Sequence, residues 1–150
     1  MIKLITAALI LFTFFSCTDD AAFNDPSFQG IKDGETWRAN DAKVTINTDG
    51  SMIVEATTNY EVVKFEILSS DIGTHTFGID ASNLASYKIT LNGSTESYTT
   101  GVNFGGGALQ ITESPSETGK LSGKFTLRGV NLEGMEAVFT YGVIYNIPVQ

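Results

Sequence analysis

The fold class is decided by the stretch from Lys43 to Ile67, which reads KVTINTDGSMIVEATTNYEVVKFEI. Apolar and polar residues alternate along it, which is the pattern of strands that bury one face. Asp49 and Gly50 interrupt the alternation with a tight-turn signal, because glycine tolerates the positive φ that two-residue hairpin loops need. The stretch therefore predicts antiparallel strands that direct alternate side chains to a core.

The same alternation recurs through the rest of the chain, and no long helical pattern accompanies it. Short turns rich in Gly, Asn, Asp and Ser separate the runs, as at Asp33-Gly34, which precedes Trp37 and predicts a first hairpin with this tryptophan in the core. Two further runs are predicted to present one face each: Tyr98, Thr100, Val102 and Phe104, then Ala137, Phe139, Tyr141, Val143, Tyr145 and Ile147. The chain is thus predicted to be all-β, a single antiparallel β-sandwich or flattened meander barrel of about nine or ten strands.

The first 16 residues form a separate segment. Lys3 gives a positive start, and an apolar run from Leu4 to Phe15 follows. Twelve helical residues span about 18 Å, whereas a bilayer core is about 30 Å thick. This combination is typical of a secretory signal peptide.

The sole cysteine, Cys17, follows this segment directly and is preceded by the small residue Ser16. The run from Phe14 to Cys17 resembles the lipobox of a bacterial lipoprotein signal, which implies cleavage before Cys17 and lipidation of its sulfur. A plain signal peptide with a coincidental cysteine is the alternative. The predicted organisation is a lipoprotein signal peptide at 1–16, a lipidated cysteine and acidic tether at 17–26, and the β domain at 27–150.

Asp19 and Asp20 follow the cysteine and allow two interpretations. They resemble the acidic lipoprotein export signal of Bacteroidetes, which implies display on the outer face of the outer membrane. They are equally consistent with solvated residues of a linker. The predicted location is the outer membrane, reached through the lipid on Cys17, with the leaflet left open.

Composition excludes several classes of function. The 150 residues carry a formal charge of −8, which argues against nucleic acid as a partner because phosphate binding needs a basic face. One cysteine excludes an internal disulfide framework, and a single histidine with a single cysteine argues against a zinc site of ordinary composition. We predict no metal and no cofactor.

The residues that could carry catalysis do not form a recognisable pattern. His75 lies in a predicted strand without a nucleophile nearby in sequence, and the acidic residues are too numerous for any pair to stand out. The run from Gly105 to Gly107 lacks the Lys-Ser/Thr pair and helix of a phosphate-binding loop. The chain is therefore predicted not to be an enzyme.

Aromatic residues are the remaining candidates for a binding role. Most should lie in the core, but a tyrosine on an exposed sheet face can stack on a sugar ring or anchor a protein partner. Tyr60 and Tyr98, which lie beside predicted turns, are the best candidates for ligand contact.

Four segments together suggest a family. They are FQGIKDGETWRA from Phe28, GALQITE from Gly107, LSGKFTL from Leu121 and TYGVIYNIPV from Thr140. With the lipoprotein cysteine, the chain resembles the DUF6252 type of uncharacterised Bacteroidetes lipoproteins, whose hallmarks are an "ngxxWxA" opening hairpin and a "G.f.nvP" ending. The motifs are structural, so the resemblance implies fold and location and transfers no active site.

The expected function is that of a membrane-anchored, non-enzymatic binding or scaffolding domain outside the inner membrane, with a glycan or a protein as its partner. The alternative is a glycan-binding accessory module in nutrient capture.

Overall fold

The computed structural model describes residues 27–150, which form an 11-stranded antiparallel sheet and one short helix. The strands are β1 (Ser27–Lys32), β2 (Glu35–Arg38), β3 (Asp41–Ile46), β4 (Met52–Thr57), β5 (Glu61–Ile67), β6 (Gly73–Phe77), β7 (Leu84–Leu91), β8 (Ser94–Thr99), β9 (Gly106–Glu113), β10 (Lys120–Val130) and β11 (Glu136–Pro148), and the helix is α1 (Pro115–Thr118). The all-β prediction is confirmed. The predicted signal peptide, tether, Cys17, Asp19 and Asp20 lie outside the described residues.

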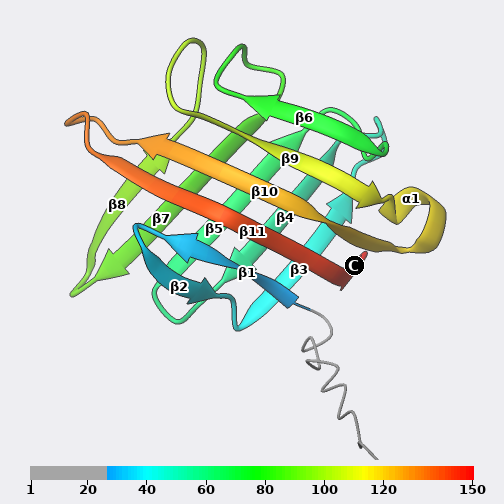
Figure 1. The fold of residues 1–150 in the computed structure, drawn as a ribbon, viewed down its shortest axis with the longest axis horizontal. Helices are drawn as coiled ribbons and strands as arrows, with labels where there is room; N and C mark the ends of the chain where they lie inside the picture. The colour runs from blue at the N-terminus through cyan, green and yellow to red at the C-terminus, as the bar shows by residue number, and fades with distance from the viewer. Residues whose placement is uncertain (1–26) are drawn as a thin grey trace, which may run out of the picture.

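The sheet curls into a half-barrel with two facing layers (Figure 1). The strand order is β2-β1-β11-β10-β8-β7-β5-β4-β3, and β9 pairs with β10 and β6 off this path. The two layers join at one side through a single pair, Val130 with Thr99, and at the other through a parallel bridge between Val44 and Val149. Of the two predicted forms, β-sandwich and flattened barrel, the structure is closer to the barrel, and it has 11 strands where about nine or ten were predicted.

The stretch that decides the fold behaves as its pattern predicts. Asp49 accepts a hydrogen bond from the backbone N–H of Ser51 at 2.9 Å, and Gly50 supplies a φ of 86° in the β3–β4 turn. Val44 then pairs with Val54, and Val54 pairs with Phe65 on the next strand. All three side chains are fully buried, so alternation in the sequence becomes one apolar row across three strands.

The core between the two layers is aromatic. Trp37 is buried as predicted, and its ring meets the ring of Phe139 edge-on with 5.5 Å between centroids. The ring centroid of Phe125 lies 4.8 Å from that of Phe28 and 5.2 Å from that of Phe65, so side chains from both layers pack against one another. Burial of large rings between the layers is the main source of stability for a sheet whose outer face is wet.

The prediction that the last run keeps one face buried is wrong for Tyr141, Val143 and Tyr145, whereas Ala137, Phe139 and Ile147 are buried as predicted. Two β-bulges at Tyr141 (φ 50°) and Asn146 (φ 53°) each add one residue to β11. Because side chains alternate with period two, each extra residue reverses the direction of those that follow. As a result Tyr141 is 84% exposed and Tyr145 is 41% exposed, while Ile144 takes the core position.

The predicted face that runs from Tyr98 to Phe104 is also interrupted. Strand β8 ends at Thr99, and a turn follows in which Gly101 and Phe104 form a bridge. Thr100 is buried as expected, but Val102 and Phe104 are exposed because they lie in this turn.

Candidate functional site

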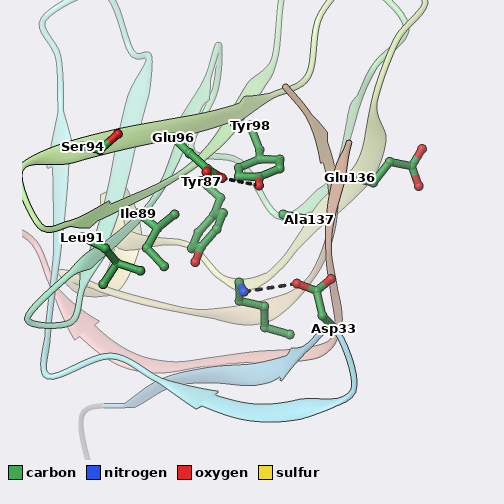
Figure 2. Close-up of a pocket in the computed structure, with 10 residues that line it drawn as sticks. Asp33, Tyr87, Ile89, Leu91, Ser94, Glu96, Tyr98, Glu136 and Ala137 are labelled. Carbon is green, nitrogen blue, oxygen red and sulfur yellow. Dashed lines mark hydrogen bonds and ion pairs between the residues drawn. The ribbon is translucent and has the colours of Figure 1, made fainter. Parts of the chain in front are cut away.

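A cavity of about 260 Å³ opens at one end of the half-barrel, between the β7–β8 hairpin and the β1–β2 turn (Figure 2). We call it the end cavity. It exists because β8 and β10 share only one pair, so the two layers separate beyond that point. Tyr87 and Tyr98 form an aromatic wall with 5.7 Å between their centroids, and Ile89 and Leu91 line the adjoining part of β7. Because Tyr87 is almost fully buried, the surface open to an occupant comes mainly from the half-buried ring of Tyr98 and the aliphatic side chains of Ile89 and Leu91.

Lys32 and Asp33 supply one side of the cavity rim. The Lys32 ammonium lies 3.1 Å from the Asp33 carboxylate and 4.9 Å from the centre of the Tyr87 ring. Asp33 is fixed in turn, because its Oδ1 accepts a hydrogen bond from the backbone N–H of Val138 at 2.9 Å. The β1–β2 turn therefore holds a cation over the aromatic wall.

Glu96 and Glu136 supply the remaining carboxylates of the rim. Glu96 accepts a hydrogen bond of 2.8 Å from the Tyr98 hydroxyl, and Glu136 accepts one of 2.7 Å from Arg128. With Asp33, the lining carries three carboxylates and one ammonium. The cavity therefore presents hydrogen-bond acceptors to an incoming ligand more than donors.

A second layer of hydrogen bonds holds the aromatic wall in place. The half-buried carboxylate of Glu61 accepts three hydrogen bonds. They come from the Trp37 indole at 2.8 Å, the Tyr87 hydroxyl at 2.6 Å and the Thr58 hydroxyl at 3.1 Å. Trp37 belongs to β2, whereas Tyr87 belongs to β7 in the opposite layer. Glu61 thus ties the two layers together behind the cavity.

The same contacts shift the acidity of both tyrosines. Burial raises the pKa of Tyr87 far above its usual value of 10.0, and the hydrogen bond to Glu61 adds to the rise. The hydrogen bond to Glu96 raises the pKa of Tyr98. Both phenols therefore stay protonated at neutral pH, and their hydroxyls donate to Glu61 and Glu96.

The predicted site residues are not brought together. Tyr98 lines the end cavity, but Tyr60 lies in the β4–β5 turn, 63% exposed and away from the cavity lining. His75 lies on β6, which pairs only with β9, and its Nε2 is 3.0 Å from the backbone carbonyl oxygen of Asp71. The histidine thus lies in a strand, as the sequence predicts, and that strand is at the edge of the sheet.

Sequence reasoning missed Tyr87, Lys32, Asp33 and Glu61. Each comes from a run that looks purely structural, and only the pairing of β5 with β7 and of β1 with β11 brings them to one end. Glu61 gave one usable signal, since it stands at the start of a strand that is otherwise largely apolar.

Within residues 27–150, no three His, Cys, Asp or Glu side chains gather in a way that could hold a metal ion. No helix within these residues is long and apolar enough to cross a membrane.

Fold and site together define an all-β domain with a ligand-sized cavity at the open end of a curled sheet. Residues 24–148 match the family described as a domain of unknown function, DUF6252, and the chain belongs to that family. No curated protein matches it, and no solved structure does.

Proposed function

We propose that this chain is a lipid-anchored protein of the outer membrane whose β domain binds a ligand and does not catalyse a reaction. The end cavity carries the binding part of the proposal. Its volume of about 260 Å³ suits one small molecule or one sugar ring, and its wall joins two tyrosine rings to fixed carboxylates. The hydrogen bonds from Tyr87 to Glu61 and from Tyr98 to Glu96 hold both rings in fixed positions, which supports a binding role.

Binding in the end cavity is tested with a variant that fills it. Leu91→Trp should block the space, and Tyr98→Ala should remove half of the aromatic wall. Tyr60→Ala is the matched control, because it removes an exposed tyrosine outside the cavity. In a thermal-shift screen of small polar molecules, hits on the wild type should be lost in the first two variants and kept in the control. Hits that survive Leu91→Trp would refute the cavity as the binding site.

The anchoring part of the proposal rests on Lys3, the apolar run after it and the lone Cys17. Two acyl chains hold a protein stably on a membrane, since each buried CH₂ contributes about 0.8 kcal/mol. Acyl labelling of cells that express the wild type or Cys17→Ala tests the anchor, and protease shaving of intact cells tests surface display. Label on the substituted protein would exclude lipidation at Cys17. Protection of the wild type from protease would exclude display and leave anchoring intact.

A glycan-binding accessory module is the second candidate. The observation in its favour is the aromatic wall beside Glu96, because sugars stack their apolar ring faces on tyrosine and donate their hydroxyls to carboxylates. A glycan array with the mature chain carrying Cys17→Ala tests it. An array without hits across broad polysaccharide classes would remove this candidate.

A further inference from the structure

The outer face of β9, β10 and β11 carries a second hollow of about 540 Å³, which we call the outer groove. Strands β9, β10 and β11 belong to the layer that appears in front in Figure 1, and the outer groove shares no lining residue with the end cavity. Tyr141 stands on its β11 side, and Lys124 and Thr126 line its β10 side. Gln110 of β9 and Thr74 of β6 extend it toward the sheet edge.

The first of the two β11 bulges is what puts an aromatic ring there. Tyr141 adopts a φ of 50°, a left-handed conformation that is costly for a bulky residue. The extra residue turns its side chain out of the core, and the ring is 84% exposed. The fold thus maintains a strained backbone whose result is an exposed tyrosine, an arrangement found where a side chain serves binding.

Small residues leave the hollow beside this ring. Gly142 adds no side chain to the lining, and its inward position is filled by the core ring of Phe125, which a Cβ there would approach within 2.4 Å. On β9, Ala108 adds only a methyl group to the lining. The floor is therefore flat and apolar, and hydrogen-bonding side chains surround it.

The charge of the outer groove opposes the charge of the chain. Lys124 is the only charged residue in the lining, and its ammonium makes no ion pair among residues 27–150. Lys120 and Arg128, four residues away on either side, are also exposed on β10. Arg128 is neutralised by its ion pair with Glu136, so among residues 27–150 this chain of net charge −8 presents two lysines without an ion pair, Lys120 and Lys124, along β10. This charge pattern favours an anionic occupant.

We propose that the outer groove binds an anionic glycan. A pyranose ring stacks on Tyr141, its carboxylate or sulfate group lies at Lys124, and its hydroxyls exchange hydrogen bonds with Thr126 and Gln110. A glycan fits better than a protein surface, because protein interfaces depend on a cluster of buried anchors and this face offers one large ring. The proposal concerns a separate face of the domain and does not rest on ligand binding in the end cavity.

The test measures affinity of the mature chain, with Cys17→Ala for solubility, by titration calorimetry. The probes are polygalacturonate, chondroitin sulfate and fully methyl-esterified polygalacturonate, which keeps the rings of the first probe and removes its charge. At least one acidic glycan should bind, and the neutral ester should bind several-fold more weakly. Tyr141→Asn removes the ring but suits the left-handed backbone, and it should weaken binding about tenfold. Lys124→Gln should weaken it about threefold and abolish the preference for acid over ester.

Tyr60→Asn and Lys88→Gln are the matched controls, because they remove an exposed tyrosine and an exposed lysine outside the outer groove. Both should bind like the wild type, and so should the cavity-filling Leu91→Trp. Absence of binding to both acidic glycans would overturn the proposal. Equal binding of acid and ester would overturn it too, as would wild-type affinity in Tyr141→Asn. Vesicles of phosphatidylglycerol that bind as strongly as the glycans would identify an anionic lipid surface as the partner instead.

Discussion

Replacement of Glu61 by alanine should destabilise the domain more than any other exposed or half-exposed charge substitution in residues 27–150. Its carboxylate accepts hydrogen bonds from Trp37 at 2.8 Å and from Tyr87 at 2.6 Å, and both donor residues are almost fully buried. A hydrogen bond to a charged group is worth about 1.5–3 kcal/mol, so two lost bonds amount to about 3–6 kcal/mol. Water can reach a half-buried site, which places the expected loss at the lower end, about 3 kcal/mol. That is a large part of the 5–15 kcal/mol typical of a domain.

The assay is urea unfolding followed by tryptophan fluorescence, since Trp37 is the only tryptophan. Glu66→Ala is the matched control: it lies on the same strand, and its carboxylate makes a surface ion pair with Lys64 at 2.8 Å, which should contribute no more than about 1 kcal/mol. Glu61→Gln should fall between them, because an amide oxygen can still accept from the indole while its NH₂ donates to the phenol. If Glu61→Ala loses no more stability than Glu66→Ala, the role assigned to Glu61 is wrong.

Three further outcomes follow from the structure. Gly142→Ala should lower the free energy of unfolding by about 1–3 kcal/mol, because the added Cβ meets the Phe125 ring at 2.4 Å. Gly106→Ala is the control: its Cβ comes no nearer than 3.7 Å to another group, so its free energy of unfolding in the same assay should stay within about 0.5 kcal/mol of the wild type. The free energy of unfolding should fall as the pH rises above about 10, because the unfolded chain then releases a phenolic proton that folded Tyr87 retains. Urea midpoints measured across alkaline pH should show this fall, and a flat profile would contradict the raised pKa of Tyr87. Tyr141→Asn should raise the free energy of unfolding by about 0.5–1 kcal/mol, because asparagine adopts the left-handed backbone with less strain, and the melting temperature should rise slightly. A clear decrease in melting temperature would show that the exposed ring contributes to the fold.

The sequence was sufficient where strands pair without irregularity. Met52, Val54 and Ala56 are buried as their alternation predicts, and the turn at Asn92 and Gly93 has the paired positive φ values, 52° and 80°, of a tight hairpin. These features depend on neighbours in the chain, so a local pattern contains them.

It was insufficient where the structure depends on distant partners. The bulge at Tyr141 is defined by how β11 pairs with β10, and tyrosine gives no sign of a left-handed backbone. The candidate site shows the same division. Tyr98 could be proposed from its place beside a turn, but its neighbours Tyr87 and Lys32 come together only when the two layers close.

The completed sheet depends on β11, which follows all the other strands in the described residues. The last strand to be made pairs with the first, β1, as well as with β10, and Val149 reaches across to β3. A nascent chain that still lacks these residues has exposed backbone edges on both neighbours and an uncovered set of aromatic rings. A chain without β11 therefore lacks the strand that joins β1 to β10, and the backbone edges of both strands stay open to pairing with other chains.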